Sequence, residues 1–308
     1  MTKDAHRVAY LINAYKQPAL LVRLVDRLSS PQSSFVLHVD RKSAGFDDVL
    51  AALAARDNVT LLPRRPIYWG SSALVQVFVA GLRTVARDLP DVGHVVYLTA
   101  QDYPMWPCSE IESFLAARPH ASFVNHLPLP QTTWIEGGRT RYERFHHSGR
   151  FGRVEWPGHV PGNRRWLRPL WSLTTRFARP RRFPAGLSPY GGSGVWALSG
   201  EAVRYVVSFL DQRPDVMRFF RWVLAPDEML IQSVMMSGPL ADSVIDSDLH
   251  HTRWEPMSAH PVIFTASELD ELERSPEPFV RKVDLELSDA LLDALDARAL
   301  SARRSEPS

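Results

Sequence analysis

A short acidic segment supplies a candidate general base. Pro226 is followed by Asp227 and Glu228. A carboxylate at the rim of a cleft can remove the proton of a hydroxyl group as that hydroxyl attacks, and such a reaction needs only one base. The structural alternative is a helix start, because Pro suits the first helical position and acids there complement the helix dipole. Taken alone, the segment favours this structural explanation.

Polar residues also stand where two strand-like segments end. The sequence His38-Val39-Asp40-Arg41-Lys42 follows one apolar run, and Gln101-Asp102-Tyr103-Pro104 follows another. Ligands bind at the carboxyl ends of strands in open α/β sheets, so Asp40 could accept hydrogen bonds from a base or ribose and Asp102 could face a sugar or diphosphate. Both acids could equally form turns or cap helices.

The segment Trp69-Gly70-Ser71-Ser72 leaves similar alternatives open, since either serine could cap the next helix and Trp69 could belong to the core. The first strand-like run ends in Tyr15-Lys16-Gln17-Pro18. Neither a dinucleotide-binding glycine fingerprint nor a phosphate-binding Walker loop stands at this position. Dehydrogenase and P-loop ATPase functions are therefore disfavoured.

The elements that must position these residues alternate between strand-like and helix-like patterns over residues 7–127. Between the apolar runs, residues such as Leu21, Leu24, Val25 and Leu28 recur at helical spacing, which is typical of stacked βαβ units. We therefore predict an α/β fold with a nucleotide-binding sheet flanked by helices. The expected strands are Arg7–Ala14, Ser34–Val39, Asn58–Leu62, His94–Thr99, Ser122–His126 and Gly194–Leu198.

Regular patterns stop at about residue 131 and return at about residue 191. We expect one domain over residues 1–300, with an irregular Arg- and Trp-rich insert (131–190) between a nucleotide-binding half (7–127) and an acceptor or catalytic half (191–300). Residues 301–308 are polar enough to fray. The expected helices of the second half are Val203–Leu210, Val216–Val223, Glu228–Met236 and Asp289–Leu300, the last capped by Ser288.

Composition excludes several classes of protein. The 308 residues are 45% apolar and carry a formal charge of only +2, which is too small for a non-specific nucleic-acid binder. Cys108 is the only cysteine, so an intrachain disulfide is excluded and a reducing compartment is favoured. The apolar run Val8–Ala14 is too short for a secretory signal or a membrane span. We therefore expect a cytoplasmic protein.

The insert carries most of the local charge. Residues 139–182 hold twelve arginines and two glutamates, a formal charge of +10, with three tryptophans among them. Arginine and aromatic side chains together suit sugars and anionic groups. The part Arg164–Arg182 could make a peripheral contact with the inner face of an anionic membrane. A solvated insert is the structural alternative.

Six short motifs follow one another along the chain. They are His38–Lys42, Trp69–Ser72, Gln101–Pro104, Gly192–Ser199, Pro226–Glu228 and Phe279–Lys282. This series resembles the core-2/I-branching β-1,6-N-acetylglucosaminyltransferase and peptide O-xylosyltransferase family, glycosyltransferase family 14, over residues 7–284. The resemblance implies a GT-A type, Rossmann-like mixed sheet flanked by helices, an inverting mechanism, a UDP-sugar donor and catalysis without a divalent metal.

The resemblance also implies roles for individual residues. It makes Glu228 the catalytic base, Lys282 the cation that neutralises the departing diphosphate, and Asp40 part of the uridine pocket. Without a metal, the charge of a UDP leaving group must be met by Lys or Arg. The implied donor-binding residues are His38, Asp40, Trp69, Asp102, Arg281 and Lys282. The implied acceptor-binding residues are Trp134, Glu136, Arg139, Arg141, Ser193, Trp196 and Asp227.

The chain departs from the family pattern at one position of the diphosphate site. The second diphosphate-binding cation of the family would fall near Ala259, where this chain has no charge. Arg253, His260 or Arg281 could substitute for it.

A metal-dependent alternative rests on Asp246-Ser247-Asp248 with His250 and His251, an acid-x-acid string of the kind that binds metal in other transferases. In those transferases the acidic pair follows the fourth main strand, so a solvated turn is the favoured explanation here. We expect no metal and no cofactor.

The prediction is inverting transfer of N-acetylglucosamine or xylose from a UDP-sugar to a hydroxyl of a carbohydrate or glycoconjugate, with no nucleic-acid partner. Two alternatives stay open. One is a non-catalytic nucleotide-sugar-binding protein at a membrane surface, and the other is a metal-dependent transferase that uses Asp246 and Asp248.

Overall fold

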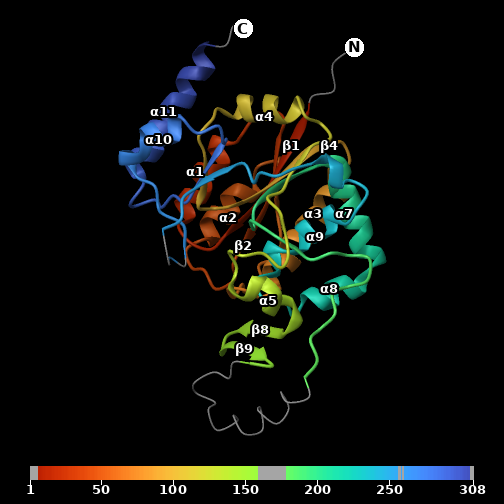
Figure 1. Ribbon diagram of the computed structural model, residues 1–308. Helices are drawn as coiled ribbons and strands as arrows, with labels where there is room; N and C mark the ends of the chain where they lie inside the picture. The colour runs from red at the N-terminus through yellow and green to blue at the C-terminus, as the bar shows by residue number, and fades with distance from the viewer. Residues whose placement is uncertain (1–5, 159–177, 256–257, 259, 306–308) are drawn as a thin grey trace.

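The centre of the molecule is a seven-stranded mixed sheet (Figure 1). The computed structural model describes residues 6–158, 178–255, 258 and 260–305. The strand order is β12-β6-β11-β4-β1-β2-β3, with β1 parallel to β2 and β4 but β11 antiparallel to β4 and β6. The predicted mixed α/β class is confirmed. The strands are β1 (Arg7–Ala14), β2 (Ser33–Val39), β3 (Val59–Leu61), β4 (Val92–Thr99), β6 (Ser122–Phe123), β11 (Trp196–Ser199) and β12 (Val244–Ile245).

Helices cover both faces of this sheet because side chains alternate along each strand. Tyr10 and Ile12 of β1 point into one core, while Ala9 and Leu11 point into the other. The first core is covered by α1 (Pro18–Arg27), α2 (Asp47–Ala54), α4 (Cys108–Ala116) and α11 (Asp289–Ser305). The second is covered by α3 (Ala73–Asp88), α7 (Gly200–Gln212), α8 (Pro214–Phe220) and α9 (Leu230–Met236).

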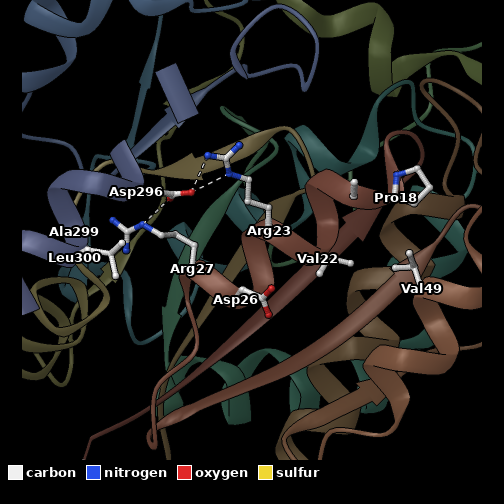
Figure 2. Close-up of a pocket in the computed structure, with 10 residues that line it drawn as sticks. Pro18, Val22, Arg23, Asp26, Arg27, Val49, Asp296, Ala299 and Leu300 are labelled. Carbon is white, nitrogen blue, oxygen red and sulfur yellow. Dashed lines mark hydrogen bonds and ion pairs between the residues drawn. The ribbon is translucent and has the colours of Figure 1, made fainter. Parts of the chain in front are cut away.

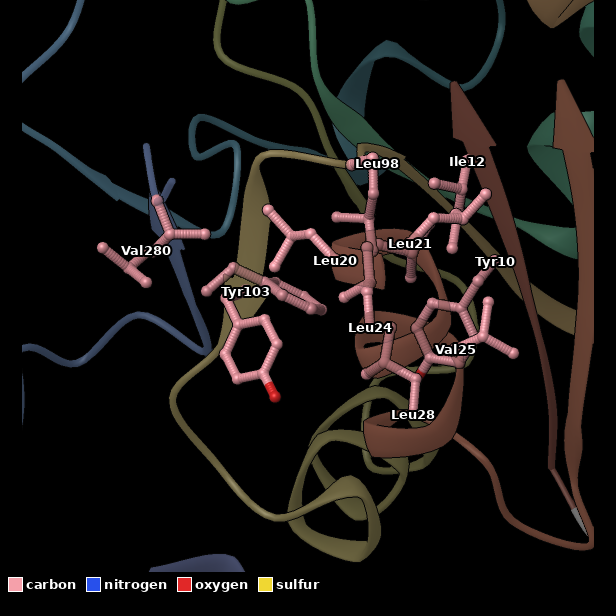
Figure 3. Packing of buried hydrophobic residues seen from close by; sticks show 14 of the residues in the cluster. Tyr10, Ile12, Leu20, Leu21, Leu24, Val25, Leu28, Leu98, Tyr103 and Val280 are labelled. Atoms are coloured by element: carbon pink, nitrogen blue, oxygen red, sulfur yellow. The ribbon is translucent and has the colours of Figure 1, made fainter. Parts of the chain in front are cut away.

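The helical spacing predicted for the first connection is confirmed. Leu21, Leu24 and Val25 of α1 and Leu28 just after it are fully buried against β1 and β4 (Figure 3). Full burial of one such side chain contributes roughly 1.5–3 kcal/mol. This packing fixes the strand register, which places Asn13 beside both His38 and Thr99. The carboxyl ends of β1, β2 and β4 therefore meet at one edge.

A second, three-stranded sheet was not predicted. Its order is β13-β14-β5, built from β5 (Asp102–Pro104), β13 (His250–Thr252) and β14 (Phe279–Arg281). Strands of three residues carry too little periodicity to be found in a sequence. The antiparallel pairing of β14 with β5 places Arg281 opposite Asp102.

The expected insert contains more regular structure than predicted. A hairpin of β8 (Phe145–Gly149) and β9 (Gly152–Trp156) follows a short helix, α5 (Arg139–Glu143), and lies at the end of the molecule opposite the chain termini (Figure 1). Strands β7 (Leu127–Pro128) and β10 (Tyr190–Gly191) pair with each other. Residues 159–177, which include most of Arg164–Arg182, lie outside the described residues.

The C-terminal helix corrects two predictions. The Ser288 hydroxyl donates to the carbonyl of Phe264 at 2.6 Å instead of capping α11. Helix α11 continues to Ser305, past the expected start of fraying at residue 301. Of the helices formed by the described residues, none is both long and apolar enough to cross a bilayer. The helix before β14 is α10 (Leu269–Glu273).

Candidate active site

The Pro-Asp-Glu segment forms a separate 3₁₀ turn, η3 (Pro226–Glu228), and helix α9 begins only at Leu230. The predicted helix start is therefore wrong by two residues. Two backbone hydrogen bonds fix the approach to this turn: the Leu224 N–H donates to the Arg141 carbonyl at 2.9 Å, and the Ala225 N–H donates to the Gly70 carbonyl at 3.1 Å. The turn is thus tied to α5 and to the loop before α3.

Glu228 and Arg141 form an ion pair in this turn. The Arg141 guanidinium also lies 3.7 Å from the ring centroid of Trp134, so it is held between an aromatic face and a carboxylate. The Glu228 side chain remains 35% exposed. A base at this position is accessible to a hydroxyl group, provided that Arg141 moves aside or takes another partner.

Asp227 is the more shielded member of the acidic pair. Burial, followed by the neighbouring charge of Glu228, raises the pKa of Asp227 to about 7, against the opposing effect of Arg141 and Arg281. A Cβ atom at Gly194 would stand 3.2 Å from the Asp227 carboxylate, so glycine permits this close approach. Ser193 lies next to it, and the Gln232 amide donates to the Ser193 carbonyl at 2.6 Å.

Asp102 is the first residue of β5, shortly after the carboxyl end of β4, and it is fully buried. Its carboxylate accepts hydrogen bonds from Arg281 at 2.6 Å and from the Thr99 N–H at 2.7 Å. Burial alone would raise its pKa, but Arg281, His250 and the Thr99 N–H hold it well below its usual range. This buried carboxylate is paired inside the protein, and its contact with the donor stays a prediction.

Lys282 follows Arg281 directly and is only partly exposed. Among the residues that the structure describes, its ammonium group has no hydrogen-bond or ion-pair partner. Burial, followed by the charge of Arg281, lowers the pKa of Lys282, and Lys16 acts in the same direction. A site with an unpaired, crowded cation favours the binding of an anion.

His38 is buried and hydrogen-bonded inside the protein, and its contact with the donor stays a prediction. Its ring nitrogen Nδ1 lies 2.7 Å from the Asn13 amide oxygen, and Nε2 accepts from the Arg65 N–H at 3.0 Å. Burial lowers the pKa of His38 to about 4, so the ring stays neutral. The nearby Asp40 carboxylate is 4% exposed and held by Lys42 at 2.9 Å. Its contact with uridine stays a prediction.

Two tryptophans of the predicted site differ in their burial. Trp69, which could have been a core residue, is 70% exposed. Trp196, predicted to bind the acceptor, is fully buried and stacks on Tyr97 with ring centroids 5.0 Å apart. Alternation along β11 turns the Trp196 side chain into the core, so its contact with the acceptor stays a prediction.

The remaining acceptor candidates divide into two groups. Trp134 and Arg141 lie at Glu228, whereas the Glu136 carboxylate pairs with Arg144 at 3.3 Å. Arg139 is exposed and lies two residues before Arg141 in α5. The structure thus brings Trp134, Arg141, Ser193 and Asp227 to the proposed base and leaves Glu136 beside them.

The residues of the metal-dependent alternative point to separate partners. Asp246 accepts from the Asn125 amide at 3.0 Å, while Asp248 accepts from the His250 N–H at 3.1 Å. The His251 ring lies 2.9 Å from the Glu271 carboxylate. Residues 6–158, 178–255 and 260–305 contain no group of three or more His, Cys, Asp or Glu side chains arranged to hold a metal.

The three candidates for the second diphosphate-binding cation differ in their partners and exposure. Arg253 pairs with Glu268 at 3.3 Å and with Glu271 at 2.5 Å. His260 is exposed, and Ala259 lies outside the described residues. Arg281 is therefore the candidate that stands beside Lys282.

A cavity of about 830 Å³ lies elsewhere, between α1 and α11 (Figure 2). Arg23 and Arg27 project into it, and both pair with Asp296 of α11. None of the strand-end residues lines this cavity. The ion pairs with Asp296 hold α11 against α1. The cavity is separate from the candidate active site.

Sequence reasoning missed Tyr15, Lys16 and Gly194. The Tyr15 hydroxyl donates to the Gln101 amide oxygen, and Lys16 pairs with Asp284 at 2.9 Å close to Lys282. Both residues follow β1, so the strand-end argument applied to Asp40 also points to them. For Gly194, the sequence offered no indication of a functional role beyond its place in the motif Gly192–Ser199.

Known proteins match this chain over most of its length. The model of the Core-2/I-branching enzyme family matches residues 8–273. The chain is 26% identical over 257 residues to xylosyltransferase 2 of Canis lupus familiaris, covering 80% of this chain and 26% of that protein. It is 24% identical over 261 residues to xylosyltransferase oxt of Drosophila melanogaster, covering 81% and 26%. The chain thus spans about a quarter of the length of these curated relatives.

Among solved structures, the chain is similar to 4-diphosphocytidyl-2C-methyl-D-erythritol synthase from Anaerococcus prevotii, with a TM-score of 0.34, 10% identity, and coverage of 70% of this chain and 83% of that chain. The family match extends over most of the chain and includes the strand ends, the Pro-Asp-Glu turn and Glu228. The chain belongs to the Core-2/I-branching enzyme family, a family of glycosyltransferases.

Proposed function

We propose that the chain transfers a sugar from a UDP-sugar to a hydroxyl group with inversion at the anomeric carbon. The observation that carries the proposal is the position of Arg281, whose charge lowers the pKa of Lys282 and opposes the rise in the pKa of Asp227. The charge of Arg281 thus acts on the acidic pair and on the unpaired Lys282. Group transfer to a hydroxyl with an anionic leaving group requires such a pair of sites.

In the proposed reaction, Glu228 accepts the proton of the acceptor hydroxyl while its oxygen forms a bond to the anomeric carbon. The bond from that carbon to the β-phosphate oxygen breaks, and its electron pair leaves with UDP. Lys282 and Arg281 meet the negative charge that develops on the diphosphate. Arg141 must leave Glu228 when the acceptor binds, because the carboxylate oxygen that it contacts has to accept the hydroxyl proton.

The donor sugar is proposed as xylose or N-acetylglucosamine. Because the curated relatives are xylosyltransferases, UDP-xylose is the first donor to test. Trp69 is a proposed donor contact, since its exposed ring can stack on a base or sugar. No divalent metal is required in this proposal, because the cationic pair occupies the place of the metal charge.

The decisive experiment is calorimetric titration of the protein with UDP in excess EDTA, beside Lys282→Ala and the control Arg298→Ala. Arg298 is a half-exposed cation on α11 that pairs with Glu273 at 3.3 Å. We expect UDP to bind without metal and Lys282→Ala to weaken it by about tenfold or more, as for a lost charge-assisted hydrogen bond.

Equal affinities in the two variants would contradict the role of Lys282. Binding that returns only with Mn²⁺ would contradict metal independence and favour a metal site. Binding of UDP without release of UDP from UDP-xylose, UDP-N-acetylglucosamine or other UDP-sugars in the presence of hydroxyl acceptors would favour a non-catalytic binding protein.

A further inference from the structure

The tip of the β8–β9 hairpin exposes an isolated aromatic side chain. A two-residue turn, Arg150-Phe151, connects Gly149 to Gly152. The Phe151 side chain is 77% exposed, and Arg150 and Arg153 on either side of it are exposed as well. Burying such a phenylalanine in a complex would contribute roughly 1.5–3 kcal/mol.

The base of this hairpin is firmly attached to the body of the protein. The His146 N–H donates to the Trp222 carbonyl at 2.9 Å. The Arg181 guanidinium donates to the carbonyls of Phe219 at 2.6 Å and Trp222 at 3.1 Å, and it also lies over the ring of Phe145. Phe151 is therefore presented on a fixed support.

A second aromatic side chain and another arginine lie beside the base of the hairpin. The partly exposed Trp222 ring contacts Phe145 and His147 of β8, with ring centroids 6.3 and 6.0 Å apart. The exposed Arg221 lies 5.5 Å from the Trp222 ring centroid. Arg153, which is paired with Ser148, stands on the other face of the hairpin. We call the tip and the two faces, with Arg150, Phe151, Arg153, Arg221 and Trp222, the hairpin surface.

We propose that the hairpin surface docks on an anionic lipid bilayer. In this arrangement Phe151 enters the headgroup and acyl boundary, Trp222 lies at the headgroup level, and the arginines contact lipid phosphates. The convex form of a hairpin tip favours a bilayer over a sugar chain, because sugars stack in grooves that surround them. The charge is complementary, since the three arginines of this surface have no acidic partner among the described residues.

The position of the surface links it to the acceptor side of the active site. Helix α5, which carries Arg141, leads through Arg144 directly into β8. A protein docked by this hairpin would hold the Glu228 side of the site toward the bilayer. The docking proposal itself does not depend on catalysis and is tested without a donor or acceptor.

The test is co-sedimentation of the full chain with vesicles of phosphatidylcholine, with and without phosphatidylglycerol. We expect binding only to the anionic vesicles, weakened by added salt. Phe151→Ser should lower the partition coefficient about tenfold or more, as expected from the loss of one buried aromatic side chain. The double change Arg150→Ala and Arg153→Ala should lower it by about tenfold to thirtyfold, at roughly 1 kcal/mol for each basic residue.

Leu300→Ser is the matched control, because Leu300 is 57% exposed on α11 at the opposite end of the molecule (Figure 1). A second measurement uses Phe151→Cys labelled with an environment-sensitive fluorophore, which is possible because Cys108 is buried. We expect the label to shift to the blue and to be quenched by spin-labelled lipids. No binding by the parent protein, equal losses in Phe151→Ser and Leu300→Ser, or an unshifted label on bound protein would overturn the proposal.

Discussion

Two segments at the strand ends carry opposite excess charge. At the acidic edge, formed by Asp227 and Glu228, a second carboxylate and burial raise the pKa of Asp227 to about 7. At the basic edge, formed by Arg281 and Lys282, a second cation and burial lower the pKa of Lys282. Each edge therefore disfavours its own charge and gains from an opposite charge supplied by a ligand.

The two edges also differ in how their charges are held. Arg281 is fixed by the buried Asp102, whereas Glu228 is paired with Arg141 at the surface. A fixed cation suits the binding of a leaving group whose position must not change. A pair that can open suits a base that must exchange its partner for a substrate. We expect the edges to respond differently to substitution.

The largest expected effect is on the acidic edge. Glu228→Gln keeps the size of the side chain but removes its basicity, so turnover should fall by about 10²-fold or more while UDP affinity is retained. Initial rates of UDP release and calorimetric titration measure the two quantities. Glu201→Gln, at a half-exposed position on α7, is the control and should leave the rate unchanged. Wild-type turnover in Glu228→Gln would remove it from catalysis.

The next effect is on the stability of the basic edge. Asp102→Asn leaves Arg281 without its buried carboxylate, so the free energy of unfolding should fall by about 2 kcal/mol. Chemical denaturation measures this loss. The control is Asp211→Asn, which breaks the exposed pair with Arg83 at 2.5 Å and should cost less than about 1 kcal/mol. Similar losses of unfolding free energy in both variants would mean that the buried pair of Asp102 and Arg281 stabilises the fold no more than an exposed pair does.

Much of this comparison rests on parts of the fold that the sequence predicts well. Strand β1 was predicted to the residue, and the carboxyl ends of β1, β2 and β4 follow from periodicity alone. The order of motifs then identified the family. The three-residue strands that hold Arg281 could not be predicted, because pairing of β14 with β5 depends on residues far apart in the chain.

The site residues divide in the same way. Residue type and motif predict roles for Glu228 and Lys282, which stay predictions, but they cannot tell which polar groups are already bonded to neighbours. His38 and Asp102 have the chemistry of ligand contacts, yet their hydrogen bonds are already satisfied inside the protein. The same limit applies to Trp196, since alternation identifies two faces of a strand without saying which face is covered.

A smaller effect would sharpen the role of Arg141. The double change Arg139→Ala and Arg141→Ala should raise the acceptor KM about tenfold and leave UDP affinity alone, because both side chains stand on the acceptor side. The control is Arg118→Ala, which removes another arginine stacked on an aromatic ring, Phe114, at 4.2 Å. An unchanged acceptor KM would show that Arg139 and Arg141 do not take part in acceptor binding.

The smallest expected effect is the pH dependence of stability at the acidic edge. The pKa of Asp227 is raised above its unfolded value of 3.8, so the folded state holds a proton that the unfolded state releases between about pH 4 and about pH 7. Stability should therefore fall as pH rises through this window. Asp227→Asn should remove about 1 kcal/mol of this decline in urea denaturation at several pH values. The exposed Asp47→Asn is the control, and an equal pH dependence in parent and Asp227→Asn would contradict the assignment.

The pairing of β14 with β5 also sets an order of assembly. Arg281 and Asp102 meet although they stand 179 positions apart in the chain. Contacts between such distant segments close a long loop and form late in folding. During synthesis, strands β1 to β4 leave the ribosome well before Phe279–Arg281 does. A nascent chain can therefore build its parallel strands early, but the pair formed by Arg281 and Asp102 is completed only when β14 is in place.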